Sequence, residues 1–346
     1  MKSSNKLIHI IPTLQNGGAE TVLTRLIEEF HYMNVIQYVF TINGKDTDFH
    51  YSHVVQFCEV IQFKNNPKKA YEILKEYPEA IFLSWMYKSI VFGYWLKFKY
   101  NISNPIIWNI RNSNFRFFQL YQKSGLFFFG LLSRLLNAKI IYCSFKSKKV
   151  HEKYFFKIKK STVIQNRLAK KIISNNNLPE NYILFVGRHH QQKGIKRLLS
   201  ISNNFLKINK NFKLIIAGYG WKLDYFPFSI REKIVLLENV INVFNLYKKS
   251  KCLLFTSVSG EGYPNVLPEA MVCGTPIVAF EAGDSKLILE NYKFGKIVKT
   301  ESDFINQLQK IIDNPFQKKK IELEIKKQKS LLDFKKTVME YKEFIF

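Results

Sequence analysis

Two glutamates in the second half of the chain have a spacing that suits carbohydrate binding. Glu261 and Glu269 lie eight positions apart in SGEGYPNVLPEAMVCGTPIVAF (259–280), a segment otherwise typical of a protein core. We expect Glu261 on a Gly-rich loop. Glu269 lies on a predicted helix from about Asn265 to Cys273, with a proline in its first turn. Carboxylates accept hydrogen bonds from vicinal hydroxyls such as those of sugars. The alternative is that neither glutamate binds a ligand: one is an ordinary acid at the start of a helix and the other faces solvent.

Two cations lie in a second loop with chemical potential. Arg188 and Lys193 occur in FVGRHHQQKGIKRLL (185–199), between a predicted strand and a predicted helix. Converging there, a guanidinium and an ammonium would neutralise a diphosphate; two solvated surface cations are the alternative. His189 and His190 lack acidic or cysteine partners at ligand spacing, so we expect them to be loop residues.

A third candidate is the glycine turn of QNGGA (15–19), between the first predicted strand and helix. Gly17 and Gly18 let the backbone approach a ligand closely, and a helix N-terminus favours phosphate or carboxylate. Tight Gly-Gly turns are common, so an ordinary turn remains the alternative.

Short apolar runs alternate with helical patterns, which predicts parallel sheets covered on both faces. The expected strands are 7–11, 36–42, 80–85, 105–111, 139–144, 161–166, 182–187, 212–218, 233–237, 251–257 and 276–280.

The chain length of 346 residues fits two α/β domains. We expect an N-terminal domain at 1–166, a linker at 167–181 and a C-terminal domain at 182–330, followed by a helix at 331–346. This last segment is apolar at positions 331, 334, 338, 341 and 345, a helical stripe. It either caps its own domain or crosses back to the first.

The formal net charge of +26 indicates a polyanionic partner. Between Lys88 and Lys171 there are 18 Lys or Arg residues against one acid, Glu152. Compositional drift would supply lysines but explains less well the loss of acids from that stretch.

The four cysteines show neither disulfide nor metal spacing, so we expect buried thiols in a cytosolic protein. No apolar run approaches the ~18 residues of a spanning helix. We therefore expect a protein that is soluble or lies on a membrane without crossing it.

Together these segments resemble glycosyltransferase family four, the retaining nucleotide-sugar transferases of the GT-B fold. Glu261 to Glu269 fits the E-x7-E motif of that family. The resemblance extends to VGRHHQQKGIKRLL, to NGGAETVLTRLI (16–27), and to SWMYKS (84–89) and WNIRNSN (108–114), which are similar to first-domain motifs of bacterial polysaccharide transferases. It runs from about residue 7 to 290.

The resemblance implies a GT-B fold, with two Rossmann-like domains facing across a cleft. It implies that Arg188 and Lys193 bind the donor diphosphate and stabilise charge as it departs. Glu269 would hold the ribose hydroxyls, and Glu261 the sugar ring, together with the backbone of Gly262, Tyr263, Pro264 and Asn265. Gly17 and Gly18 would approach the diphosphate or the acceptor from the other domain. No metal and no other cofactor is implied.

The sequence departs from the family pattern at three places. Lys88 stands where a histidine that contacts the donor sugar is expected, so either Lys88 takes over a contact or the donor site is altered. Ala282-Gly283 replaces the usual Gly-Gly, and Lys286 replaces a frequent Glu. Asp46-Thr47-Asp48 has the D-x-D form that holds a metal-bound nucleotide sugar in another transferase fold, but its polar surroundings favour turn chemistry.

The leading hypothesis is a glycosyltransferase that acts in the cytoplasm at the inner face of the membrane. It would move a sugar from a nucleotide-sugar to a lipid-linked saccharide acceptor for surface polysaccharide. The basic aromatic stretch at 114–139 suggests contact with anionic lipid; part of it would equally fit a core helix.

Two alternatives belong to other classes. Charge alone suggests a nucleic-acid-binding protein, but no such motif is present and the two glutamates stay unexplained, so we expect no nucleic acid. A nucleotide-sugar epimerase of similar fold is the other alternative.

Overall fold

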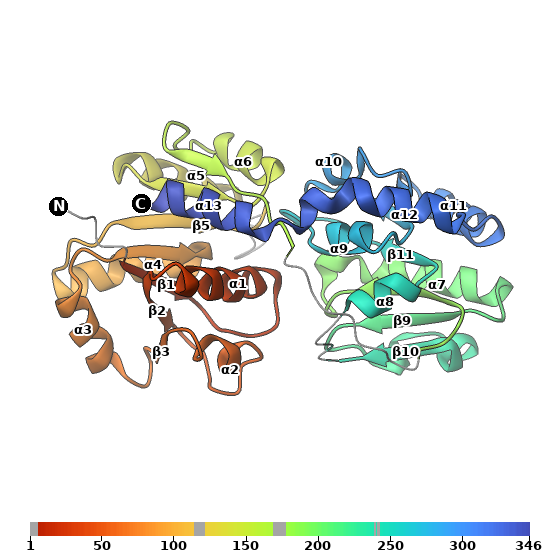
Figure 1. Ribbon diagram of the computed structural model, residues 1–346, viewed down its shortest axis with the longest axis horizontal. Helices are drawn as coiled ribbons and strands as arrows, with labels where there is room; N and C mark the ends of the chain where they lie inside the picture. Colours follow the sequence, from red (N-terminus) through yellow and green to blue (C-terminus); the bar gives the residue numbers. More distant parts are fainter. Residues whose placement is uncertain (1–5, 114–121, 169–177, 239, 241–242) are drawn as a thin grey trace. The chain divides into compact units, whose positions relative to one another are not determined.

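The computed structural model describes residues 6–113, 122–168, 178–238, 240 and 243–346. The chain forms two compact units (Figure 1). Unit 1 comprises Met1–Asn166 and Phe334–Phe346, and unit 2 comprises Arg167–Asp333. Most of the predicted linker, residues 169–177, lies outside the described residues, as does the segment 114–121 of the basic aromatic stretch.

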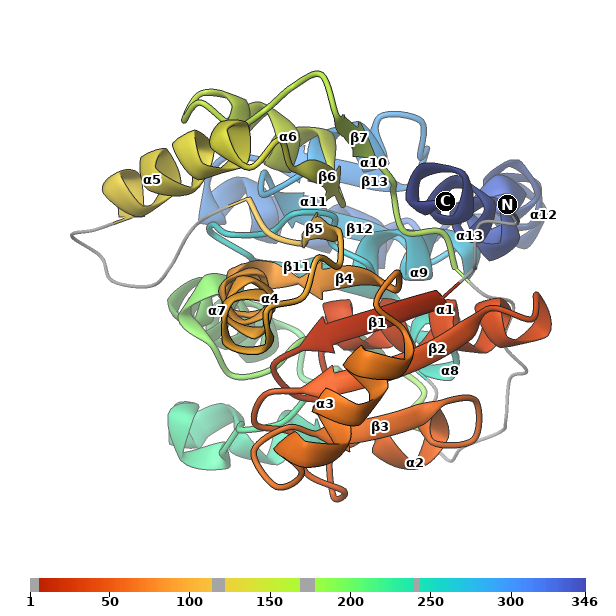
Figure 2. The same ribbon diagram turned by 90° about the vertical axis from the view of Figure 1, so that its left-hand side faces the viewer.

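Unit 1 is built on a seven-stranded parallel sheet of order β3-β2-β1-β4-β5-β6-β7 (Figure 2). After β3 the chain returns to the other side of β1, so the strand order reverses between β1 and β4. The carboxyl ends of these two neighbouring strands form the switch point where open sheets bind ligands. The strands are β1 Lys6–Ile11, β2 Ile36–Thr41, β3 Glu59–Gln62, β4 Ile81–Trp85, β5 Ile106–Ile110, β6 Lys139–Tyr142 and β7 Ser161–Val163.

The helices of unit 1 connect these strands, except for the last, which returns from the end of the chain (Figure 1). In this last helix, α13, the hydroxyl of Tyr341 accepts hydrogen bonds from Arg111 Nη1 at 3.0 Å and Asn109 Nδ2 at 3.2 Å. The C-terminal helix therefore crosses back to the first domain, one of the two arrangements left open by the sequence. The helices are α1 Gly18–Tyr32, α2 Tyr51–Val54, α3 Pro67–Glu76, α4 Met86–Tyr100, α5 Gln122–Leu135, α6 Phe145–Glu152 and α13 Phe334–Ile345.

The apolar stripe predicted for the last helix is divided between two elements. Leu331 lies in a short 3-10 helix, Gln328–Leu332, and packs against the core of unit 2. The helix itself begins at Phe334, and buries Phe334, Val338, Tyr341 and Ile345 in unit 1. Leu331 and Phe334 are three residues apart, which is the spacing of neighbours on one helix face, so the sequence pattern did not distinguish the 3-10 helix from α13.

Unit 2 repeats the architecture with a six-stranded parallel sheet of order β10-β9-β8-β11-β12-β13. Its switch point lies between β8 and β11. The strands are β8 Tyr182–Val186, β9 Lys213–Ala217, β10 Ile234–Leu237, β11 Cys252–Phe255, β12 Ile277–Phe280 and β13 Gly295–Val298. The helices are α7 Ile195–Ile208, α8 Phe244–Lys249, α9 Val266–Val272, α10 Ser285–Leu289, α11 Glu301–Asp313 and α12 Lys318–Lys327.

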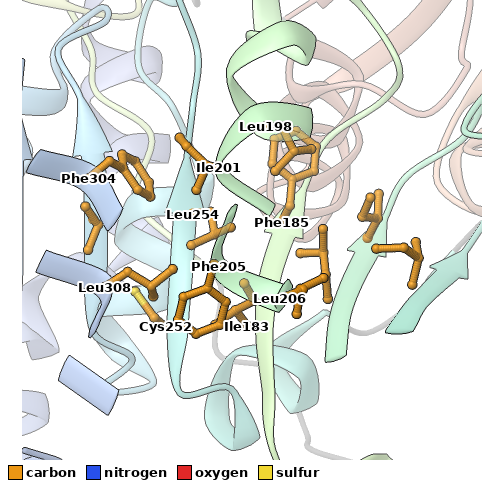
Figure 3. Packing of buried hydrophobic residues seen from close by; sticks show 14 of the residues in the cluster. Ile183, Phe185, Leu198, Ile201, Phe205, Leu206, Cys252, Leu254, Phe304 and Leu308 are labelled. Carbon is orange, nitrogen blue, oxygen red and sulfur yellow. The ribbon is translucent and has the colours of Figure 1, made fainter. Parts of the chain in front are cut away.

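Alternate residues of the unit 2 strands enter two separate cores, because successive side chains of a strand point to opposite faces. Ile183 and Phe185 of β8 pack with α7 and α11 on one face (Figure 3). Tyr182 and Leu184 pack with α8 and α9 on the other. Both faces are therefore covered, as the near-continuous apolar strands predicted.

The predicted fold class is confirmed: each unit is a Rossmann-like parallel sheet with helices on both faces. The eleven predicted strands are present, and no end is shifted by more than three residues. Two strands were missed, β3 and β13. Both are four-residue strands at a sheet edge, too short to show a period.

Candidate active site

The candidate site of unit 2 lies at its switch point, because the two loops that carry its charged residues follow neighbouring strands. The loop after β8 carries Arg188 and Lys193, and the loop after β11 carries Glu261. Strands β8 and β11 are hydrogen-bonded in parallel, so their carboxyl ends meet at one sheet edge. Lys193 and Glu261, which are 68 positions apart in the sequence, are therefore neighbours in the fold.

Lys193 and Glu261 form an ion pair at this edge. The ammonium Nζ of Lys193 donates to Oε1 of Glu261 at 2.7 Å, and the hydroxyl of Ser257 donates to the same oxygen at 2.8 Å. The Glu261 side chain is 9% exposed and that of Lys193 is 21% exposed. A charge-assisted, partly desolvated pair of this kind fixes both side chains.

The two loops are locked together by backbone contacts. The hydroxyl of Thr256 donates to the carbonyl of Lys193 at 2.7 Å, and Val258 N donates to the carbonyl of Gln192 at 3.0 Å. Gly194 has φ +71°, and a Cβ there would lie 1.9 Å from the carbonyl oxygen of Thr256. Only glycine fits this close approach in a left-handed conformation.

Arg188 follows β8 directly and is exposed. Within the described part of the chain no hydrogen bond or ion pair engages its guanidinium. An unengaged cation beside a fixed ion pair is a suitable ligand for an anion. The neighbouring histidines have structural contacts: His189 stacks on Tyr225 at 4.4 Å, and His190 Nδ1 accepts from Gln192 N at 3.3 Å.

Glu269 is held by a separate contact. It lies in the first turn of α9, where the predicted helix is confirmed, and it is half-buried. The hydroxyl of Tyr247 in α8 donates to Glu269 Oε2 at 2.9 Å. Burial, and then the Glu269 carboxylate, raise the pKa of Tyr247 well above its usual value, so the hydroxyl keeps its proton. Tyr247 could not be identified from the sequence, because it is one more aromatic residue in a short buried helix.

The loop from Glu261 to Asn265 is shaped by the segment after β12. Asp284 N donates to the carbonyl of Gly262 at 3.0 Å. Gly283 has φ +60°, and a Cβ added there would lie only 2.5 Å from the same carbonyl oxygen, so a larger residue does not fit. The backbone N–H groups of Gly262 and Tyr263 have no acceptor among the residues that the structure describes. Burial raises the pKa of the Tyr263 hydroxyl to about 12. The charge of Arg167 lowers this pKa, and the charge of Asp284 raises it.

Pro264 and Asn265 directly precede α9, the helix that carries Glu269. The carbonyl of Pro264 accepts from Leu267 N at 3.1 Å, and that of Asn265 accepts from Glu269 N at 3.1 Å. The loop and the helix start therefore form one connected turn.

The predicted residues of unit 1 lie at the switch point of their own sheet. Gly17 precedes α1 after β1, and Lys88 is an exposed residue in the first turn of α4 after β4. A Cβ on Gly17 would lie 2.3 Å from Oε2 of Glu20, so a carboxylate of the chain itself packs against this glycine. That carboxylate stands where we expected an external anion; Gly18, the next residue, is exposed.

The D-x-D segment has a structural role. Oδ2 of Asp48 accepts from Leu14 N at 2.9 Å and Lys45 N at 3.1 Å, joining the loops after β1 and β2. Across the described residues there is no group of three His, Cys, Asp or Glu side chains that could hold a metal ion. Among those same ranges, no helix has the length and apolar character to span a bilayer.

A second surface of interest lies on α5 and the turn after α6. Phe127, Phe128, Leu131 and Leu135 of α5 are exposed, whereas its Leu126 and Phe129 are buried. The Phe127 ring contacts the exposed ring of Phe155, with centroids 5.2 Å apart. The helix thus has one core face and one outer apolar face.

Cations gather at the same turn. The pKa of Lys157 is lowered, first by partial burial and then by repulsion from Lys160, Lys159 and Arg134. Lys157, Lys159 and Lys160 follow one another in the sequence here, and Arg134 Nε donates to the carbonyl of Phe155 at 2.6 Å, which brings the end of α5 to the same turn. An apolar face beside clustered cations is typical of proteins that bind anionic membranes.

The chain is similar to known proteins in part of its sequence and in its fold. Residues 180–314 match the family model described as glycosyl transferases group 1. No curated protein sequence matches the chain.

Similar solved structures cover both units. Sucrose-phosphate synthase from Thermosynechococcus elongatus has a TM-score of 0.76 at 16% identity, with 98% of this chain and 97% of that chain covered. Anabaena HepE in complex with UDP-glucose has a TM-score of 0.71 at 17% identity, with 98% of each chain covered. WaaG, a glycosyltransferase involved in lipopolysaccharide biosynthesis, has a TM-score of 0.70 at 13% identity, with 98% and 99% covered.

The fold is that of the GT-B glycosyltransferases to which the chain is similar. In the second unit, the range that matches the group 1 glycosyl transferase model includes Arg188, Lys193, Glu261 and Glu269. The family resemblance drawn from the sequence motifs is thereby confirmed.

Proposed function

We propose that the protein is a retaining glycosyltransferase that moves a sugar from a nucleotide-sugar to a lipid-linked saccharide acceptor. The proposal places it in surface polysaccharide synthesis, in the cytoplasm, at the inner face of the membrane. The observation that carries it is the Lys193–Glu261 ion pair at the switch point of unit 2, at the same sheet edge as Arg188, whose guanidinium no described residue engages. A site with two cations and a fixed acid suits a sugar attached to a diphosphate.

In the proposed reaction Arg188 and Lys193 bind the donor diphosphate. Their charges stabilise the negative charge that develops as the sugar–phosphate bond breaks, which takes the place of a metal ion. Glu261, fixed by Lys193 and Ser257, accepts hydrogen bonds from sugar hydroxyls. The N–H groups of Gly262 and Tyr263 provide further donors at the same loop.

Glu269 holds the ribose hydroxyls, with Tyr247 fixing its carboxylate. The acceptor hydroxyl attacks from the face that the leaving diphosphate vacates, and a phosphate oxygen takes its proton. The configuration at the sugar carbon is therefore retained.

The solved structures support the substrate class. HepE of Anabaena was solved with UDP-glucose, and WaaG acts in lipopolysaccharide biosynthesis. The charge of +26 and the cationic, apolar outer face of α5 support an anionic membrane as the place of action.

A melting-shift screen against a panel of nucleotide-sugars tests the donor site. A ligand that binds only the native state at 100 times its Kd stabilises by about 2.7 kcal/mol, so Tm rises for the true donor. Glu269→Ala should reduce this shift, whereas Lys207→Ala, which changes an exposed lysine at the far end of α7, should not.

The product of a reaction with the identified donor separates the alternatives. Sugar found on a saccharide acceptor with its anomeric configuration unchanged supports transfer. Sugar that remains on the nucleotide with an inverted ring carbon would identify an epimerase instead. No Tm shift with any nucleotide-sugar contradicts the proposal.

A further inference from the structure

The outer face of helix α4 is apolar although it is exposed to solvent. Val91, Trp95 and Phe98 follow one another at helical spacing and are 55%, 40% and 90% exposed. The inner face of the same helix buries Ile90 and Leu96 in the core of unit 1. A helix that is apolar on both faces is typically covered on both. The exposed face of α4 therefore indicates a partner.

The charges of α4 indicate the chemistry of that partner. The helix contains three lysines and neither Asp nor Glu. Lys99 is exposed, and its ammonium lies 4.6 Å from the ring centroid of Trp95 and 5.3 Å from that of Tyr100. Trp and Tyr rings beside a lysine are typical of the headgroup level of a membrane, where the rings enter the lipid and the ammonium stays in water. An anionic lipid surface complements this face in both apolar area and charge.

Helices α4 and α5 cover the same face of the unit 1 sheet. Ile90 of α4 and Leu126 of α5 belong to one core cluster, together with Trp108 of β5. The exposed apolar residues of the two helices therefore belong to one helix layer, and one planar bilayer can contact both. The neighbouring helix α3 is not part of this surface, because its Glu72 and Glu76 are exposed.

Other partners suit the face less well. A symmetric contact between two copies of the chain would bring the lysines of both α4 helices together, with no acid of the helix to neutralise them. A sugar stacked on Trp95 is also disfavoured, because this ring already stacks on Phe92, with centroids 5.3 Å apart, and lies beside the Lys99 ammonium.

We propose that the outer face of α4 inserts Trp95 and Phe98 into the headgroup region of an anionic membrane, as a second contact besides α5. The inference rests on the proposed function, because that function places the protein on such a membrane. It adds which part of unit 1 enters the lipid, and it keeps Lys99 at the level of the lipid phosphates.

Tryptophan fluorescence with brominated lipid tests this contact directly, because bromine quenches only a ring that it touches. The chain has four tryptophans, and Trp95 is the exposed one, since Trp85, Trp108 and Trp221 are at most 5% exposed. Vesicles of phosphatidylglycerol and dibrominated phosphatidylcholine in equal parts should quench the wild type. Trp95→Phe should lose this quenching and still float with the vesicles.

A charge placed on the same face tests its contribution to binding. Phe98→Glu should weaken flotation with these vesicles by roughly 10-fold, because it removes apolar area and adds a carboxylate beside lipid phosphate. Phe228→Glu in unit 2 is the matched control, since Phe228 is 86% exposed and Phe98 is 90% exposed. Both side chains lie outside the core, so both variants should fold as the wild type does. Quenching of the wild type should decrease as salt rises.

The contrary outcomes are distinct. Flotation without quenching of Trp95, or equal flotation of Phe98→Glu and Phe228→Glu, overturns the inference and leaves α5 as the membrane contact. Shielding of Trp95 from acrylamide without vesicles, in a chain that sediments as a dimer, assigns the face to a second copy and also overturns it.

Sugar transfer by the wild type separates this inference from the proposed function. Quenching of Trp95 without transfer to any acceptor contradicts the transferase and supports the α4 contact. Transfer without quenching contradicts the α4 contact and supports the transferase.

Discussion

The ammonium of Lys193 lies 2.7 Å from a carboxylate oxygen of Glu261, although the two residues leave different strands of the unit 2 sheet. In this arrangement each charge is the other's partner. In the proposed reaction, a donor diphosphate that binds Lys193 shares it with Glu261, so this contact would also orient the acid toward the sugar. We therefore expect the pair to contribute to both stability and catalysis, and the two effects can be measured separately.

A double-mutant cycle with Lys193→Met and Glu261→Gln measures the pair. Each single variant removes one charge from a site in which the carboxylate is almost fully buried, so we expect a coupling energy of about 1 kcal/mol in urea unfolding. Transfer activity should fall by roughly 100-fold in each single variant. Additive stability effects would show that the contact does not contribute to stability. Activity within a factor of about two of wild type would show that it has no functional role.

Arg188 is expected to act mainly on turnover. Because it is exposed and no described residue engages it, Arg188→Ala should leave the melting temperature within about 1 °C of wild type. Its charge matters most as the diphosphate departs, so kcat should fall by roughly 100-fold, with a smaller change in KM. Steady-state kinetics with Lys207→Ala as the matched control give this comparison. A loss of stability as large as the loss of activity would instead make Arg188 a folding residue.

Tyr247 offers a test of Glu269 that keeps the carboxylate in place. Tyr247→Phe preserves the buried ring and removes the hydroxyl that donates to Glu269 at 2.9 Å. The acid then loses its orientation, and donor binding should weaken by roughly 5-fold, as for a lost hydrogen bond of about 1 kcal/mol. Glu269→Ala should weaken it further. Isothermal titration with the donor checks both, with Glu290→Ala, an exposed acid after α10, as the control. Tighter donor binding by Tyr247→Phe would mean that the hydroxyl competes with the ribose.

The sequence predicted more of unit 2 than of unit 1, and the reasons lie in particular residues. Arg188, Lys193 and Glu261 could be chosen as candidates because each lies in a loop that follows an apolar run, and strand ends of a parallel sheet share one edge. Tyr247 and Ser257 were not, since their roles depend on a hydroxyl's direction, which no spacing encodes. The Glu20 carboxylate that packs against Gly17 could not be predicted, because a side chain that folds back over one turn leaves no sequence signature.

Stability should fall in mild acid because of two buried histidines in unit 1. Burial lowers the pKa of His9 and of His151 from 6.5 to about 4, despite hydrogen bonds to Gln37 and the Ser147 carbonyl that act in the opposite direction. Both stay neutral in the native state while the unfolded chain takes up protons below pH 6.5. Their contribution is thus complete above pH 6.5 and is lost as the pH falls toward 4, by up to about 1.4 kcal/mol per histidine and pH unit.

Urea midpoints measured between pH 7 and pH 4 check this expectation. His9→Gln should flatten the dependence, since a neutral amide cannot take up the proton in the unfolded chain. A stability that does not vary across this window would mean that water reaches both rings.

Membrane binding should depend on the outer face of α5. Leu135 is 74% exposed at the end of that helix, beside the cations clustered around Lys157. Leu135→Glu adds a negative charge and removes apolar area there, so flotation with anionic vesicles should weaken by roughly 10-fold. Ile208→Glu is the matched control, because Ile208 is 73% exposed at the end of α7 in unit 2. Binding should also fall as salt rises, since part of it is electrostatic. Equal flotation of both variants, or binding indifferent to salt and to lipid charge, would assign the α5 face to another partner.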